Sequence, residues 1–197
     1  MKLLKNRLIM LFVIFFLTAS AVQGGFEYKS FRAHKGGDIT PLEAYRIQKE
    51  NPKNTFLVDV RTRAEYQFVG HAEGAFNIPF MFLSNDAGQR GYNLVPNTDF
   101  IKELKALFNT ETDTLLIYCK GGGRSMMAAE AAVKAGFDEA RVFNILGGFE
   151  GDINNNKESI YHGKPFYGGW IREGLPWTYD MNPILMYQPD IKVKNNN

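Results

Sequence analysis

The sequence has very little cysteine, with one residue, Cys119, among 197. A lone cysteine excludes a disulfide within the chain, so Cys119 persists as a thiol, carries a modification or bonds to another molecule. The sequence also lacks a large excess of positive or negative charge. Its formal net charge is only +2, which argues against a nucleic-acid partner. The hydrophobic share of 45% and the charged share of 22% are ordinary for a globular protein.

A hydrophobic run long enough to span a membrane is absent. The apolar run at residues 8–17 is far shorter than the roughly 20 residues that a transmembrane helix needs. Basic residues precede this run and Ala19-Ser20-Ala21 follows it, a pattern typical of a secretory signal peptide. We therefore expect residues 1–21 to be removed and the remaining chain to be periplasmic, nearly neutral and without a membrane span.

Several motifs that would indicate other functions are missing. There is no internal repeat, no Gly-Lys-Ser/Thr at P-loop spacing and no Gly-x-Gly-x-x-Gly, so the glycine-rich stretch is not a nucleotide site. His34 and His162 have no companions at metal-ligand spacing. We expect neither a metal site nor a cofactor.

The most informative stretch is Cys-Lys-Gly-Gly-Gly-Arg-Ser at residues 119–125. An apolar run at 114–118 predicts a buried strand before it, and helix-forming residues at 126–134 predict a helix after it, ended by Gly136. Unpaired backbone N–H groups at such a junction stabilise an anion, and consecutive glycines let them converge. With two cations beside it, Cys119 is expected to be a thiolate, the nucleophilic form. The alternative is a buried structural cysteine.

The rest of the chain alternates between helices and strands. Thr40, Pro41 and Glu43 predict a helix over 41–50, Thr62 caps a short helix, and Thr98 caps another with its apolar face at Phe100, Ile101, Leu104, Leu107 and Phe108. Strands are predicted at 55–60, 75–78 and 141–146, and a loop at 84–97. This order predicts an α/β fold with a central parallel sheet that binds ligands at the carboxyl ends of its strands, where Cys119 lies.

A single domain with appendages fits this length. We place an N-terminal arm at 22–38, the domain at 39–180 and a C-terminal tail at 181–197. Residues 151–169 begin polar and become aromatic, and they interrupt the domain as a long insertion.

An ordered set of short motifs makes the chain similar to a known protein family. These are Asp59-Val60-Arg61, Glu65-Tyr66, Gly70-His71, Gly74-Ala75, Asn77-Ile78-Pro79, the Cys119 loop, Leu146-Gly147-Gly148, Trp170 and Gly174-Leu175-Pro176. Together they resemble a single-domain rhodanese. The resemblance implies a three-layer α/β/α fold. The insertion departs from the family, in which the tryptophan follows the double glycine within a few residues, and this leaves the substrate open.

The resemblance also implies an activity, which is the transfer of sulfane sulfur from a donor such as thiosulfate to cyanide or a thiol. By that likeness Cys119 is the catalytic nucleophile and forms a persulfide. The substrate-binding residues are Lys120, Gly121, Gly122, Gly123, Arg124 and Ser125, whose backbone amides and cations would hold a small anionic donor. Asp59 and Arg61 are expected to support the loop. His71 is interpreted as a structural residue, since a preformed thiolate needs no base.

Two other functions stay open. Phosphatases and arsenate reductases of the related fold place five residues between cysteine and arginine, whereas four separate Cys119 from Arg124 here. The other alternative is a non-catalytic sulfur carrier that docks a periplasmic protein acceptor through residues 151–170.

Overall fold

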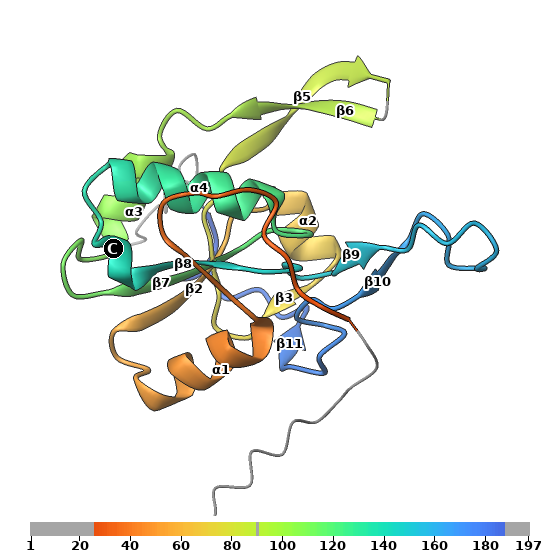
Figure 1. Cartoon of the computed structure of the whole chain (residues 1–197). Coiled ribbons are helices and arrows are strands. Elements are labelled where there is room, and N and C mark those ends of the chain that lie inside the picture. Colours follow the sequence, from red (N-terminus) through yellow and green to blue (C-terminus); the bar gives the residue numbers. More distant parts are fainter. Residues whose placement is uncertain (1–25, 90, 188–197) are drawn as a thin grey trace, which may run out of the picture.

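The computed structural model describes residues 26–89 and 91–187 (Figure 1). The predicted signal peptide 1–21 lies outside the described residues, as do positions 22–25 of the arm and 188–197 of the tail. In the described ranges, every helix is too short or too polar to cross a membrane.

A parallel five-stranded sheet forms the centre of the domain. Its strand order is β1-β8-β7-β2-β4, and each neighbouring pair is parallel. The strands are β1 Gly37–Ile39, β2 Thr55–Asp59, β4 Phe76–Asn77, β7 Thr114–Tyr118 and β8 Val142–Ile145. The predicted α/β fold with a central parallel sheet is confirmed. Strand β1 was not predicted, and it includes Gly37 and Asp38, which the sequence interpretation placed in the arm.

Helices cover both faces of this sheet. Helix α1, Pro41–Glu50, packs on one face, and helices α3, Phe100–Leu107, and α4, Gly123–Lys134, pack on the other (Figure 1). Strand β7 contributes side chains to the core on both faces of the sheet, because successive side chains along a strand point to opposite faces. Leu116 and Tyr118 pack on the α1 side, whereas Leu115 and Ile117 pack on the α4 side, where Cys119 continues the alternation.

The first two helices begin where the sequence predicts. Helix α1 is capped by Thr40, and α2, Arg63–Phe68, by Thr62; each threonine forms a reciprocal capping box with a glutamate three residues on. Capping boxes satisfy backbone N–H groups that have no partner inside the helix. The two helix starts predicted from the capping residues are therefore confirmed.

The other two helix starts differ from the prediction. Asp99, not Thr98, occupies the cap position of α3, and the Asp99 N–H donates to Asn97 Oδ1 at 3.0 Å. Helix α4 begins at Gly123 instead of Met126, because Gly122 adopts the left-handed φ of 105° that turns the chain into the helix. Arg124 and Ser125 consequently belong to the first turn of α4.

The prediction of a loop over residues 84–97 is wrong. Strand β5, Met81–Gly88, pairs antiparallel with β6, Gly91–Pro96, with Leu83 opposite Leu94. Asparagine, aspartate, glycine and proline in this stretch suggested a loop, but cross-strand pairs of apolar residues stabilise a two-stranded ribbon.

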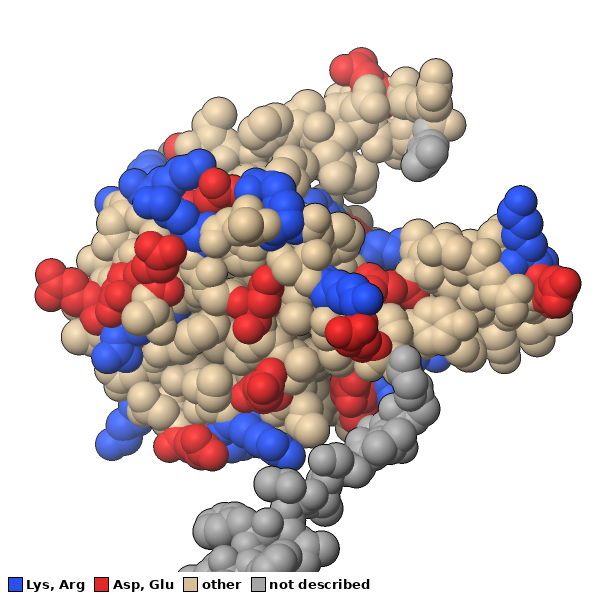
Figure 2. All heavy atoms as spheres, viewed as in Figure 1, with Lys and Arg blue, Asp and Glu red and all other residues tan. Residues whose placement is uncertain are grey.

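The insertion forms a second hairpin. Its strands are β9 Asp152–Ile153 and β10 Pro165–Tyr167, and it projects from the side of the domain on which α4 begins (Figure 1). In Figure 2, charged side chains of both signs are interspersed over the body of the domain, and the two hairpins are mostly uncharged. The remaining elements are β3 His71–Ala72, paired with β11 Trp177–Thr178, and the short 3-10 helix η1 Glu139–Arg141.

Candidate active site

Cys119 lies at the carboxyl end of β7, directly before the turn into α4. Its side chain is only 2% exposed, yet the backbone N–H of Gly122 points at the sulfur, with 3.2 Å from N to Sγ. The Ser125 hydroxyl is 3.4 Å from the same sulfur. The positive end of the α4 dipole also faces this junction. Of the predicted loop amides, that of Gly122 reaches hydrogen-bonding distance of the sulfur.

The chain that follows β8 holds the Cys119 loop in place. Backbone N–H groups of Phe149 and Glu150 donate to the carbonyls of Cys119 and Lys120 at 2.8 and 2.9 Å. Gly148 approaches so closely that a Cβ there would collide with the Cys119 carbonyl oxygen and lie 2.9 Å from the Gly121 nitrogen. The two loops therefore fit together only with glycine at position 148.

The two cations predicted beside the sulfur are both paired with glutamates. Arg124 donates to both carboxylate oxygens of Glu65, at 2.8 and 2.6 Å, and is largely buried. Burial alone would lower the pKa of Arg124, but the hydrogen bonds and charge of Glu65 raise it overall. Lys120 is half-exposed and lies 3.8 Å from Glu150, so its charge faces solvent beside the loop. The structure thus presents Lys120 as the more accessible cation.

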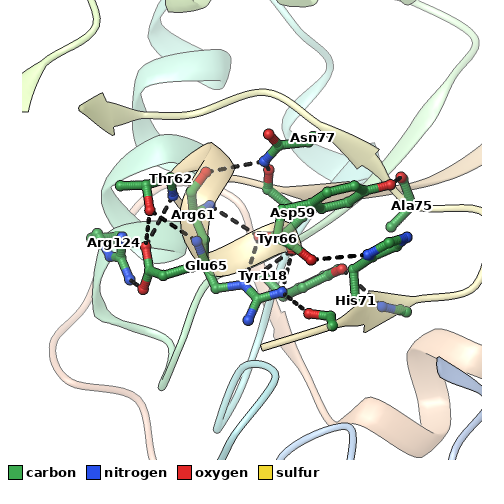
Figure 3. Close-up of polar contacts among 12 residues, drawn as sticks. Asp59, Arg61, Thr62, Glu65, Tyr66, His71, Ala75, Asn77, Tyr118 and Arg124 are labelled. Carbon is green, nitrogen blue, oxygen red and sulfur yellow. Dashed lines mark hydrogen bonds and ion pairs between the residues drawn. The ribbon is translucent and has the colours of Figure 1, made fainter. Parts of the chain in front are cut away.

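Asp59 and Arg61 form a fully buried ion pair behind the loop (Figure 3). Arg61 Nη2 donates to Asp59 at 2.6 Å and to the carbonyl of Gly70 at 2.7 Å. The guanidinium also lies 4.3 Å from the ring centre of Phe149, whose N–H holds the Cys119 carbonyl. The pair therefore supports the loop from behind through Phe149, and the structure gives it no direct contact with the sulfur.

His71 belongs to the same buried network, on the far side from Arg124 (Figure 3). Its ring stacks on Tyr66 with centroids 3.6 Å apart, and Nδ1 donates to the Tyr66 carbonyl at 3.0 Å. Burial lowers the pKa of His71, which keeps the ring neutral. These contacts are those of a structural histidine.

A hollow of about 1020 Å³ opens above the sulfur. The loop residues Cys119, Lys120, Gly121, Gly123 and Arg124 line its floor, and Gly122 and Ser125 contact the sulfur from within the fold. The insertion lines one side with residues 151–156 and Tyr167. The candidate site therefore combines an enclosed sulfur with an open approach.

The N-terminal arm completes the rim of this hollow, which sequence patterns did not indicate. Phe26 and Phe31 line it, and Phe26 stacks on Tyr167 with ring centres 5.7 Å apart. The Tyr28 hydroxyl donates to Glu173 at 2.7 Å and accepts from the Gly169 N–H at 2.9 Å, which anchors the arm to the domain.

Asn144 and Glu65 are further site residues that the site prediction left out. Asn144 accepts the hydroxyl proton of Ser125 at 2.7 Å, and its place in an otherwise apolar strand was the available signal. From the sequence, Glu65 was recognised only as part of the Glu65-Tyr66 motif, and its contact with Arg124 was not predicted. Among the described residues, no group of three or more histidine, cysteine or acidic side chains is arranged to hold a metal ion.

Comparison with known proteins places this geometry in a family. The family model of the rhodanese-like domain matches residues 40–154. An uncharacterised protein of Rickettsia conorii is 32% identical over 143 residues, which is 72% of this chain and 97% of that protein. A chloroplastic protein of Arabidopsis thaliana named thiosulfate sulfurtransferase 16 is 31% identical over 119 residues, covering 60% of this chain and 76% of that one.

A solved structure supports the same assignment. The crystal structure of a protein from M. tuberculosis matches with a TM-score of 0.58 and 32% identity, covering 74% of this chain and 99% of that one. The family motifs, the parallel sheet and the position of the cysteine between β7 and α4 agree with one another. The chain belongs to the rhodanese-like domain family.

Proposed function

We propose that this protein is a sulfurtransferase that carries sulfane sulfur as a persulfide on Cys119. The Cys119 thiolate attacks the outer sulfur of thiosulfate, the S–S bond of the donor breaks, and sulfite leaves with the electron pair. Cyanide or a thiolate then attacks the terminal sulfur of the persulfide. The product, thiocyanate in the case of cyanide, leaves with that sulfur, and the Cys119 thiolate is restored.

One observation carries this proposal, which is the Gly122 N–H directed at Cys119 Sγ at 3.2 Å, where a parallel strand meets the amino end of a helix. A backbone donor and a helix dipole both favour negative charge on sulfur, as the thiolate and as the persulfide. The open hollow lets a small anion reach this sulfur, with the half-exposed Lys120 beside the path. Relatives named thiosulfate sulfurtransferase add support by analogy.

The direct test is thiocyanate release from thiosulfate and cyanide by the purified protein. Cys119→Ser should abolish it, and the wild-type protein treated with thiosulfate alone should gain about 32 Da, the mass of one sulfur atom, on Cys119. Because the chain has one cysteine, the adduct has only one possible thiol. No adduct and no thiocyanate from a folded protein would refute the proposal.

The phosphatase alternative loses support from the geometry. A phosphatase needs its loop arginine to hold the substrate oxyanion, but both terminal nitrogens of Arg124 are bonded to Glu65. Turnover of an aryl phosphate with no sulfur transfer would reverse this ranking.

The carrier alternative retains one observation in its favour. The β9–β10 hairpin beside the hollow carries exposed apolar side chains, with Ile153 51% and Ile160 89% exposed. A carrier would take up sulfur poorly from free thiosulfate but accept it from a protein of the same compartment. Shortening the hairpin loop between 154 and 164 should then abolish capture by that protein and leave the reactivity of Cys119 unchanged.

A further inference from the structure

A buried line of polar side chains runs from the sulfur to the edge of the sheet. Ser125 Oγ lies 3.4 Å from Cys119 Sγ and 2.7 Å from Asn144 Oδ1, and Asn144 Nδ2 donates to Asp38 Oδ1 at 2.7 Å. Ser125 and Asn144 are fully buried. Asn144 on β8 lies directly opposite Asp38 on β1 in the parallel register, so the sheet itself sets this contact.

The carboxylate of Asp38 fixes which end of the Asn144 amide faces Ser125. An ionised carboxylate only accepts hydrogen bonds, so the amide must present Nδ2 to Asp38 and Oδ1 to Ser125. Burial would raise the pKa of Asp38, but hydrogen bonds from Asn144 and His34 lower it overall and keep the carboxylate ionised. His34 Nε2 lies 3.0 Å from Asp38 Oδ1 and reinforces this arrangement.

Ser125 has one hydroxyl proton and three acceptors within reach. They are Asn144 Oδ1 at 2.7 Å, the Gly122 carbonyl at 3.0 Å and Cys119 Sγ at 3.4 Å. A hydroxyl donates one hydrogen bond at a time, and the shortest of these contacts is to Asn144. The proton is therefore directed away from the sulfur. The Gly122 N–H, with 3.2 Å from N to Sγ, is then the hydrogen-bond donor to the sulfur.

We propose that Asn144 is a positioning residue that withholds the Ser125 proton from Cys119 and so keeps the sulfur basic and nucleophilic. The inference rests on the proposed function of Cys119 and explains how its reactivity is set. A second donor on a thiolate stabilises it and lowers its pKa. A less basic thiolate is intrinsically a weaker nucleophile, so the uptake of sulfur by Cys119 slows once all of the thiol is ionised, whereas release, in which Cys119 is the leaving group, is not slowed.

Among the described residues, the charged groups nearest the sulfur form no hydrogen bond with Asn144. They are Lys120 and Arg124 of the loop, their partners Glu150 and Glu65, and Asp152 on the wall of the hollow. Asn144 does contact one other charged group, Asp38. An effect through the Asp38 charge would shift the midpoint with or without the Ser125 hydroxyl, so a Ser125→Ala background separates it from the redirected proton.

The test measures the pH midpoint of Cys119 alkylation by iodoacetamide, followed by mass spectrometry. Asn144→Leu removes the nearest acceptor. The Gly122 carbonyl already accepts the Met126 N–H at 3.0 Å, so the Ser125 proton should turn to the sulfur and the midpoint should fall by about 0.5–1 pH unit. At pH values above the midpoint, uptake of sulfur from thiosulfate, followed as the rate of formation of the persulfide adduct, should slow by about two- to threefold. In a Ser125→Ala background the same substitution should leave the midpoint unchanged, because no hydroxyl remains to redirect.

Asn144→Val supplies a second variant, whose β-branched side chain suits a strand. It also removes the acceptor of the Ser125 proton, so the midpoint should again fall. Ser125→Ala should cancel this shift, whereas an effect through the charge of Asp38, which loses its bond from Asn144 Nδ2, would persist. Asn97→Leu replaces another buried asparagine, which donates to the Pro79 carbonyl, and should leave the midpoint unchanged.

Each outcome decides between the alternatives. A lower midpoint that Ser125→Ala cancels supports the proposal. A midpoint that is unchanged, higher, or shifted equally without the Ser125 hydroxyl overturns it, and if Asn144→Leu does not fold, Asn144→Val decides. Because alkylation does not depend on sulfur transfer, absence of thiocyanate with the predicted midpoint shift would overturn the proposed function and leave the role of Asn144 intact.

Discussion

Arg124 and Glu65 are joined by two parallel hydrogen bonds, from Nη1 to Oε2 at 2.8 Å and from Nη2 to Oε1 at 2.6 Å (Figure 3). The same carboxylate accepts from the N–H and hydroxyl of Thr62, at 2.9 Å each, as the capping box of α2. One glutamate therefore caps a helix and fixes the first turn of α4 beside the reactive sulfur.

Glu65→Gln should destabilise the fold and change its response to acid. Losing the carboxylate leaves the largely buried Arg124 without a counter-charge, which we expect to cost about 2 kcal/mol of unfolding free energy. Burial raises the pKa of Glu65, but hydrogen bonds and charge from Arg124 lower it from 4.5 to about 2. The stabilisation is therefore complete above the unfolded pKa and is lost as pH falls from 4.5 toward 2.

Urea unfolding of the wild type and of Glu65→Gln near pH 6 and pH 3 measures both effects. The difference between the two proteins should be larger near pH 6. Glu111→Gln, which changes an exposed glutamate, is the matched control and should behave as the wild type. An equal difference at both pH values would show that the ion pair with Arg124 does not depress the pKa of Glu65.

The buried Asp59–Arg61 pair should be more sensitive to loss of one partner than to loss of both. Asp59→Asn leaves an uncompensated guanidinium in a fully buried position, and Arg61 Nη1 has no hydrogen-bond partner among the described residues. We expect a loss of about 3–5 kcal/mol for this single substitution. The double variant Asp59→Leu/Arg61→Met should lose less in urea unfolding. Equal or greater loss in the double variant would contradict the expected desolvation penalty.

Local signals were sufficient to predict the caps of α1 and α2, the apolar strand β7 and the position of Cys119 at its end. Thr40 and Thr62 each have a glutamate three residues later, so their caps depend on neighbours in sequence alone. The run at 114–118 is buried on both faces, which is why it reads as continuous apolar sequence.

Features set by distant parts of the chain could not be predicted in this way. Strand β1 has only three residues, and it pairs with β8, which lies more than 100 positions later in the chain. The local sequence at Gly37 and Asp38 therefore does not predict a strand. Arg124 has the motif position of an anion-binding residue, but its bond to Glu65 joins residues that are 59 positions apart in the sequence. Phe31 reaches the hollow only because the arm folds back over the loop.

His71 should be dispensable for sulfur transfer and should make the fold less stable in mild acid. Its pKa is lowered by burial, so the folded protein prefers the neutral ring. The unfolded chain takes up the proton near pH 6.5, and stability should therefore fall as pH drops below this value. His71→Gln should reduce that slope in unfolding measurements and keep thiocyanate formation within about twofold, because no base is needed. A much larger loss of turnover in a folded variant would assign His71 a role in the reaction.

Replacement of Gly148 should harm the active loop, although Gly148 lies outside it. An alanine Cβ there would lie 2.8 Å from the Lys120 carbonyl carbon and 2.9 Å from the Gly121 nitrogen, and φ at this position is 55°. Backbone cannot move aside as a flexible side chain can, so Gly148→Ala should displace the Cys119 loop and reduce thiocyanate formation by at least about tenfold. Gly74 has φ of 76° but open space around its Cβ direction, so Gly74→Ala adds backbone strain of about 1 kcal/mol without touching the loop. Equal activity in the two alanine variants, measured where both are folded, would show that contact between the two loops does not hold the sulfur in place.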